Sequence, residues 1–213
     1  MKIGVFDSGI GGEAVAHELR SLIEYAEVVS VNDHKNVPYG GRPKDEIIEL
    51  TDAAIQPLLK QGCDAIVLAC NTATTNAISA LRERYPTQKF VGLEPMVKPA
   101  ARTSKTKKIA VLATPATLQS QRYAELKKQW AENVTVFEPD CHTWATLIEN
   151  NKINDVDLEA VITPLLEADV DVIVLGCTHY HWLKNTIQKK VGSDITVLEP
   201  SNAISSRILS IVG

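Results

Sequence analysis

The sequence predicts an α/β protein built from two pseudo-symmetric halves, each a mainly parallel sheet flanked by helices. Short β-branched runs alternate with longer helix-like stretches along all 213 residues, which is typical of strand-helix-strand units. Aromatic residues make up 5% of the chain and hydrophobic residues 45%. The core must therefore consist mainly of Ile, Val, Leu and Ala, as buried parallel strands prefer. A repeat within the sequence is the third observation.

Eight short apolar runs are predicted to be strands, and longer amphipathic patterns between them, such as residues 44–60 and 118–130, are predicted to be helices. Strands that alternate with helices favour right-handed crossover connections within parallel sheets. The predicted strands, in chain order, are residues 2–6, 28–31, 65–69, 90–93, 109–112, 134–137, 172–175 and 195–198.

The repeat relates the first half of the chain to the second. Residues 54–70 and residues 161–177, at an offset of 107, are identical at nine of seventeen positions, including a cysteine at the end of each segment. Two further segments, near residues 2–6 and 93–95, recur at offsets of 106 and 105. We therefore expect two similar domains, residues 1–97 joined by a C-terminal helix at 204–213, and residues 98–203, with a cleft between them.

Composition excludes several classes of protein. The net charge is -4, and the longest basic block is Lys105-Thr106-Lys107-Lys108, so we expect no nucleic-acid partner. The longest apolar runs are far shorter than a membrane span. Asp7 ends the first apolar run, whereas a signal peptide needs a longer uninterrupted apolar stretch. The four cysteines are too widely spaced for a CxxC motif, so we expect a cytoplasmic protein with free thiols.

Polar residues follow four of the predicted strands, where ligands bind in open α/β sheets. One cysteine in each half occupies such a position, Cys70 in the first and Cys177 in the second. A free cysteine is ordinarily a small buried apolar residue, but these two are paired by the repeat. The loops concerned are residues 7–12, 70–74, 114–117 and 176–180.

Two opposed thiols suit the inversion of a carbon centre. A thiol has an ordinary pKa of about 8.5, so one can act as a thiolate base while the other stays protonated and acts as an acid. One would remove the Cα proton from one face, and the other would protonate the planar carbanion from the opposite face. Cys70 and Cys177 are therefore the candidate acid/base pair.

The repeat is asymmetric beside the two thiols. Asp7 aligns with Ala113, whereas His179 aligns with Thr72. We expect Asp7 to assist Cys70 and His179 to assist Cys177. The alternatives are that Asp7 caps the helix after the Gly-rich loop and that His179 is a solvated residue at a helix start.

The same loops carry hydroxyl and amide groups but no arginine. With the backbone N–H groups of the Gly-rich turn, they could hold the carboxylates of a small dicarboxylic amino acid, although each could also be a helix cap. The residues are Ser8, Asn71, Thr72, Thr114, Thr117 and Thr178.

The chain resembles the glutamate racemases of the aspartate/glutamate racemase superfamily. The motifs that carry the resemblance span nearly the whole chain: Phe6-Asp7-Ser8-Gly9-Ile10-Gly11-Gly12, Pro38-Tyr39-Gly40, Cys70-Asn71-Thr72-Ala73-Thr74, Thr114 with Thr117, and Gly176-Cys177-Thr178-His179-Tyr180.

The resemblance implies a racemase that needs no cofactor, supplies D-glutamate for peptidoglycan and forms a homodimer. It implies an acid/base pair of Cys70 and Cys177, assisted by Asp7 and His179. Glu149 stands where the family places an acid near the cleft, and Cys141 would be a packing cysteine. The substrate contacts that it implies are Ser8, Pro38, Tyr39, Gly40, Asn71, Thr72, Thr114, Thr117 and Thr178.

The chain departs from the family pattern at several positions. His181 and Trp182 follow His-Tyr where the family usually has proline, His142 replaces a proline after Cys141, and Glu13 replaces an apolar residue after Gly-Gly. The family usually carries a longer C-terminal segment.

Other functions remain open from the residues alone. Gly9-x-Gly11-x-x-Ala14 follows a strand, and Asp33 lies where a ribose-binding acid would stand, so a nicotinamide-dependent oxidoreductase is one alternative. A catalytically silent carboxylate-binding protein of the same fold is another. Cys70, Cys177 and His179 could also bind a metal, although no metal is expected. The residues do not separate glutamate from aspartate as the substrate.

Overall fold

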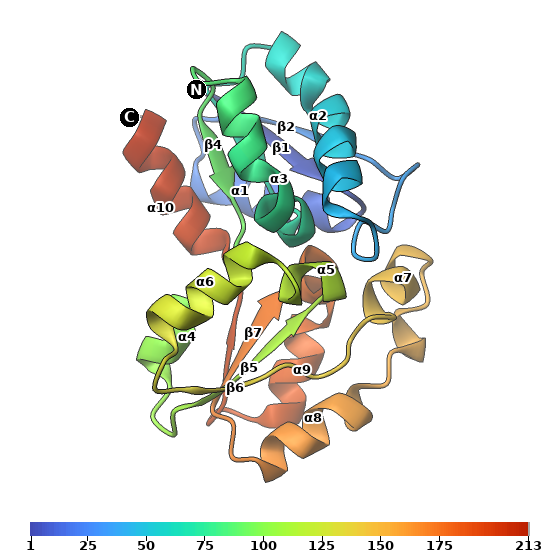
Figure 1. Ribbon diagram of the computed structural model, residues 1–213, viewed down its shortest axis with the longest axis vertical. Coiled ribbons are helices and arrows are strands. Elements are labelled where there is room, and N and C mark those ends of the chain that lie inside the picture. The colour runs from blue at the N-terminus through green and yellow to red at the C-terminus, as the bar shows by residue number, and fades with distance from the viewer. Residues whose placement is uncertain (213) are drawn as a thin grey trace. The chain divides into compact units, whose positions relative to one another are not determined.

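The computed structural model describes residues 1–212 and divides into two compact units. The first comprises Met1–Glu94 together with the chain from Pro200 onward, and the second comprises Pro95–Glu199. Each unit contains one four-stranded parallel sheet with helices packed against it (Figure 1). The predicted fold class is confirmed.

The sheet of the first unit has the strand order β2-β1-β3-β4. Ile3 and Val5 point to a core shared with α1 and α10, whereas Gly4 on the other face lies against Leu58 of α2. The strands are Lys2–Asp7 (β1), Glu27–Asn32 (β2), Ala65–Leu68 (β3) and Phe90–Gly92 (β4), and the helices are Gly11–Leu22 (α1), Lys44–Lys60 (α2), Asn71–Arg84 (α3) and Ser201–Val212 (α10).

The sheet of the second unit has the equivalent order β6-β5-β7-β8. One face of β5 packs on α4 and α6 through Ile109 and Val111. The strands are Lys108–Ala113 (β5), Thr135–Phe137 (β6), Val172–Gly176 (β7) and Thr196–Leu198 (β8). The helices are Val97–Thr103 (α4), Pro115–Leu118 (α5), Gln121–Trp130 (α6), Trp144–Glu149 (α7), Leu158–Glu167 (α8) and Lys184–Val191 (α9), with 3₁₀ helices at Ile153–Asp155 (η1) and Thr178–Leu183 (η2).

The helix that follows the last strand of each sheet belongs to the other unit. The helix after β4, α4, belongs to the second unit, and the helix after β8, α10, belongs to the first. In the first unit, α10 lies beside α1 and β4 (Figure 1), and its Ile204 and Ile208 complete the core. Burial of two large aliphatic side chains stabilises this arrangement by several kcal/mol, about 2 for each.

The sequence repeat is also a structural repeat. Helices α2 and α8 carry Pro57 and Pro164 at equivalent positions, and both helices end in a turn through a residue with positive φ. These residues are Gly62, with φ of 64°, and Asp169, with φ of 65°. In both turns the next amide donates to a carbonyl in the last turn of the helix.

All eight predicted strands are present. The start of the helix predicted over residues 118–130 is wrong. The chain forms two helices there, because α5 ends at Leu118 and α6 begins at Gln121. Ser120 separates them, and its hydroxyl oxygen accepts a hydrogen bond from the Tyr123 amide at 3.2 Å. A serine N-cap inside an apolar pattern therefore starts a new helix.

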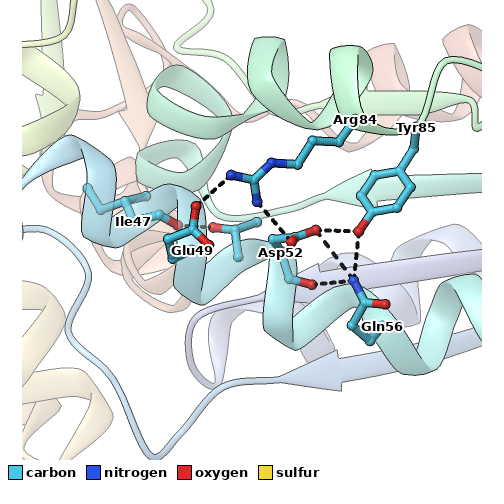
Figure 2. Close-up of polar contacts among 7 residues, drawn as sticks. Ile47, Glu49, Asp52, Gln56, Arg84 and Tyr85 are labelled. Atoms are coloured by element: carbon cyan, nitrogen blue, oxygen red, sulfur yellow. Dashed lines mark hydrogen bonds and ion pairs between the residues drawn. The ribbon is translucent and has the colours of Figure 1, made fainter.

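A polar network joins α2 to the end of α3 on the surface of the first unit (Figure 2). The Arg84 guanidinium contacts Glu49 at 2.5 Å and Asp52 at 2.9 Å. The Tyr85 hydroxyl donates to Asp52 at 2.7 Å and accepts from the Gln56 amide at 2.9 Å. These bonds orient the end of α3 against α2.

Over residues 1–212, no helix combines the length and the apolar character that crossing a membrane requires.

Candidate active site

Cys70 lies between the end of β3 and the start of α3. Its side chain is 6% exposed and occupies the N-cap position, where the sulfur accepts a hydrogen bond from the Ala73 amide at 3.4 Å. The Ser8 hydroxyl donates to the same sulfur at 3.3 Å. Two donors and the positive end of a helix dipole favour a negative charge on this sulfur.

Asp7 is the last residue of β1 and is fully buried. Its carboxylate accepts a hydrogen bond from the Gly9 amide at 2.9 Å, within the loop. The N-cap residue of α1 is Ile10, so Asp7 does not occupy the N-cap position itself. A Cβ atom on Gly12 would lie 2.4 Å from the Asp7 Cβ, so this close approach requires glycine.

Asn71 and Thr72 follow Cys70 and are both buried. The Asn71 amide nitrogen donates to the Leu93 carbonyl at 3.0 Å, which fixes the orientation of the side chain. Its amide oxygen, Oδ1, is buried and has no hydrogen-bond partner within residues 1–212. A buried acceptor without a donor is costly, so this oxygen is suited to receive a donor from a ligand.

Tyr39 lies in the loop that joins β2 to α2, between the exposed Pro38 and the half-buried Gly40. Its ring is 1% exposed and packs against Phe6, with ring centroids 6.3 Å apart. Burial is the largest cause that raises the pKa of Tyr39 well above its ordinary value, and the hydrogen bond to Asp33 is the second. The charge of Cys70 acts in the same direction. The hydroxyl is therefore protonated at neutral pH.

Cys177 occupies the corresponding place after β7 and is 7% exposed. Its sulfur lies 3.8 Å from Nδ1 of His179, whose Nε2 lies 2.5 Å from the Glu149 carboxylate. An ionised Glu149 favours the tautomer with the proton on Nε2, which leaves Nδ1 to accept the thiol proton. His179 is 3% exposed, so the alternative of a solvated residue is wrong.

Three hydroxyl groups of the second unit lie buried at the ends of its strands. Thr114 follows β5 at the N-cap position of α5, but its hydroxyl donates to the Thr117 hydroxyl at 3.1 Å and makes no cap bond to a backbone amide. Thr178 follows Cys177 directly and is 1% exposed. The side chain of Thr114 therefore does not make the cap bond that was one alternative for it.

Comparison with known proteins places the chain in a family. The family model for Asp/Glu/Hydantoin racemase matches residues 13–206. Curated relatives include a glutamate racemase of Aliarcobacter butzleri, 39% identical over 99% of this chain and 84% of the relative. Another is a glutamate racemase of Roseiflexus, also 39% identical, over 99% of this chain and 79% of the relative. The chain belongs to the Asp/Glu/Hydantoin racemase family.

Solved structures agree with this membership. Escherichia coli glutamate racemase in complex with L-glutamate and the activator UDP-MurNAc-Ala matches with a TM-score of 0.88 and 28% identity, over 99% of this chain and 82% of that one. Aquifex pyrophilus glutamate racemase matches with a TM-score of 0.81 and 36% identity, over 100% of this chain and 84% of that one. These matches confirm the predicted resemblance and the assignment to the amino-acid racemases. They favour a racemase over the alternative of a nicotinamide-dependent oxidoreductase.

Two of the departures from the racemase pattern, Glu13 and His142, have local explanations. Glu13 is exposed, and its carboxylate accepts hydrogen bonds from Ser30 at 2.7 Å and Asn32 at 2.9 Å, so a charged residue is satisfied there. His142 is exposed and pairs with Asp140 at 2.7 Å. Trp182 is 52% exposed. Burial lowers the pKa of the neighbouring His181, so this imidazole is neutral at pH 7.

Cys141 is a packing residue beside the second thiol. It is fully buried, and burial raises its pKa to about 12, so it is not a thiolate at neutral pH. The Tyr180 hydroxyl donates to its carbonyl at 2.8 Å, and the Tyr180 ring contacts Trp144 edge-on. This cluster supports the 3₁₀ helix η2 that carries His179.

The first unit thus brings Ser8 and Cys70 together, and the second brings together Cys177, His179 and Glu149. Sequence reasoning missed one contact, between the Tyr39 hydroxyl and Asp33. Asp33 drew attention only as a ribose-binding acid, and no spacing rule links it to Tyr39.

Proposed function

We propose that this chain interconverts L- and D-glutamate without a cofactor, with Cys70 and Cys177 as acid and base on opposite faces of Cα. One observation carries the proposal: two buried thiols occupy repeat-related strand ends, and each is in contact with a group that can donate or accept a proton. Relatives that cover nearly the whole chain are named glutamate racemases, which favours glutamate over aspartate.

In the proposed reaction, Cys177 reacts through the His179–Glu149 pair. His179 Nδ1 takes the thiol proton, and Glu149 stabilises the resulting imidazolium through Nε2. The Cys177 thiolate then removes the Cα proton of one enantiomer, and the Cys70 thiol protonates the carbanion from the other face. The reverse reaction exchanges the two roles.

Cys70 reacts in a different setting. The Ala73 amide and the Ser8 hydroxyl stabilise its thiolate form, so that it can give up its proton to the carbanion or take one from the opposite enantiomer. We assign Asp7, buried at the end of the adjacent strand, as its proton partner.

The buried polar groups supply the substrate contacts. We assign the Asn71 amide oxygen as an acceptor for the α-ammonium group, because it is buried and lacks a donor within residues 1–212. The carboxylates would be held by hydroxyl groups and by backbone N–H groups of the loops. The contacts that we assign are Ser8, Pro38, Tyr39, Gly40, Thr72, Thr114, Thr117 and Thr178.

The biological setting is also part of the proposal. We propose that the chain works in the cytoplasm as a homodimer and that its D-glutamate is used for peptidoglycan. Light scattering coupled to gel filtration tests the dimer. Rescue of a D-glutamate-requiring bacterial strain by the expressed chain tests the supply of D-glutamate.

Solvent deuterium incorporation tests the chemistry directly. The protein is incubated in D₂O with D- and L-glutamate and with D- and L-aspartate, and Cα deuterium and optical rotation are followed. We expect Cys70→Ser and Cys177→Ser each to reduce racemisation by at least about 100-fold, because each removes one general acid/base. The matched control is Cys63→Ser, since Cys63 is a buried thiol against Gly4 and Leu58, away from both sites.

The outcomes separate the alternatives. Unchanged turnover in either variant would refute the role of that cysteine. A protein that binds glutamate but leaves its Cα free of deuterium is a silent binding protein. Loss of activity on chelation, restored by metal, would indicate a metal-dependent reaction instead.

A further inference from the structure

Asp33 is the first residue after β2 and is hydrogen-bonded on several sides. Its carboxylate accepts the Tyr39 hydroxyl at 2.8 Å, and both carboxylate oxygens lie 3.0 Å from the Asn36 amide nitrogen. Its own amide donates to the carbonyl of Asp7 at 3.1 Å. One acidic residue thus links the loop that carries Tyr39 to the strand end that carries Asp7.

Arg42 closes the other end of this loop. Its Nη2 and Nε donate to the Asn36 carbonyl at 2.7 and 3.1 Å, and Nε also lies 3.3 Å from the Pro38 carbonyl. The guanidinium further pairs with Glu46 on α2. Residues 33–42 are therefore held at both ends, by a carboxylate at one and a guanidinium at the other.

The Tyr39 hydroxyl has its proton committed to Asp33. The ring is buried against Phe6, so the hydroxyl cannot turn toward a ligand without breaking this bond and disturbing the packing. A hydrogen bond to a charged acceptor contributes more than a neutral one. Tyr39 is thus an anchor by its side chain, and the segment that it fixes is Pro38-Tyr39-Gly40.

We infer that Asp33 is a positioning residue for the reaction: by holding the Tyr39 hydroxyl it keeps the Pro38-Tyr39-Gly40 segment in its substrate-binding conformation. This inference rests on the proposed function, in which that segment contacts glutamate. In that function the segment holds the substrate and transfers no proton, so it would contact bound substrate and transition state alike. Loss of the anchor should therefore raise KM and leave kcat nearly unchanged.

The first unit offers a matched pair for comparison. Asp52 also accepts a tyrosine hydroxyl, that of Tyr85 at 2.7 Å, and it too has an amide donor nearby, that of Gln56 (Figure 2). This pair lies on α2 and the end of α3 and is assigned no part in the site. Asp52→Asn weakens and Tyr85→Phe removes the same type of bond in the same unit.

The experiment measures kcat and KM for both enantiomers of glutamate in Asp33→Asn, Tyr39→Phe and the double variant, beside Asp52→Asn and Tyr85→Phe. We expect KM to rise about tenfold in each site variant, as for loss of one hydrogen bond to a charged group. We expect kcat to change less than about twofold. The double variant should raise KM by less than the product of the two single effects, because both single variants weaken the same bond between Asp33 and Tyr39. The control variants should keep the wild-type KM.

Several results would overturn the inference. These are an unchanged KM in Tyr39→Phe, a fall in kcat at constant KM, additive effects in the double variant, or an equal rise of KM in the control variants. Tyr39→Phe removes one hydroxyl and remains informative if Asp33→Asn does not fold.

Failure of the proposed function is a separate result. If the wild type leaves Cα unexchanged in D₂O, glutamate affinity measured by calorimetry replaces KM. A tenfold weaker affinity in Asp33→Asn and Tyr39→Phe supports the anchor without racemisation. No glutamate binding by the wild type, or equal affinity in all variants, overturns it.

Discussion

The two cysteine sites hold equivalent positions in the repeat but are built differently. Cys70 caps the 14-residue helix α3 and takes hydrogen bonds from Ser8 and Ala73. Cys177 precedes the six-residue 3₁₀ helix η2, makes no cap bond and lies beside His179. Repetition therefore accounts for the position of each thiol, and divergence of the neighbouring residues accounts for its chemistry.

The difference lies in how each sulfur handles a proton. A helix N-terminus and a hydroxyl stabilise a thiolate but do not readily accept its proton. An imidazole held by a carboxylate accepts and returns protons near neutral pH. If both thiols act on one carbon, the two halves of the reaction have different proton routes even though the substrates are mirror images.

Among the variants that compare the two sites, we expect the largest difference in kcat/KM between His179→Asn and Ser8→Ala. We expect His179→Asn to lower kcat/KM about 100-fold, because it removes a proton acceptor. We expect Ser8→Ala to lower it about tenfold or less, because it removes one hydrogen bond to sulfur. Rates are measured with Cα-deuterated D- and L-glutamate.

Isotope effects show which proton transfer each variant slows. The enantiomers have equal free energies, so kcat/KM stays equal in both directions, but the enantiomer deprotonated by the altered thiol should show the larger primary isotope effect. The two variants should therefore affect opposite enantiomers. If His179→Asn and Ser8→Ala raise the isotope effect for the same enantiomer, the idea of separate proton routes is contradicted. His17→Asn, an exposed imidazole on α1, is the control.

The sequence was sufficient for the fold class because its main signals are local or repeated. Alternating patterns located all eight strands, and the repeat located the equivalent thiols. The break at Ser120 was missed because a single cap bond divides one continuous apolar pattern.

Contacts between distant residues were the harder part of the site. Glu149 lies 30 residues before His179, and resemblance alone suggested that it was near the site. The bond between Asp33 and Tyr39 depends on how the loop after β2 closes, which no pattern of apolar residues encodes. Side-chain pairings of this kind follow from the three-dimensional path of the loops.

A second pair of equivalent residues, Asp64 and Asp171, tests how the units differ in stability. The Asp64 carboxylate accepts the Lys2 amide at 2.7 Å. That of Asp171 accepts the Ser104 hydroxyl and the Lys105 amide, both at 2.6 Å, and the Thr106 amide at 3.0 Å. Burial opposes ionisation of Asp171, but these hydrogen bonds outweigh it and lower its pKa.

We expect Asp171→Asn to reduce the free energy of unfolding by about 1 kcal/mol at pH 7, and Asp64→Asn by less. A lowered pKa means that the stabilisation is complete above the pKa of the unfolded state, about 4, and is lost as the pH falls through the lower folded value. The difference between wild type and Asp171→Asn should therefore shrink below pH 4 in urea titrations. A difference that is independent of pH would indicate a packing effect instead.

The smallest expected effect comes from the turns that end α2 and α8. Gly62 and Asp169 have the same positive φ, which favours glycine and which aspartate tolerates at a cost. Asp169 also lies 3.8 Å from Lys108, but both side chains are exposed, so this ion pair contributes little.

We expect Asp169→Gly to raise the free energy of unfolding by about 0.5 kcal/mol and Gly62→Asp to lower it by a similar amount. No atom lies within 4 Å of a Cβ added at Gly62, so the cost there is one of backbone conformation. Asp169→Asn removes the charge and keeps the tolerance for positive φ. If Asp169→Asn lowers the free energy of unfolding and Asp169→Gly fails to raise it, the Lys108 ion pair outweighs the backbone at this turn.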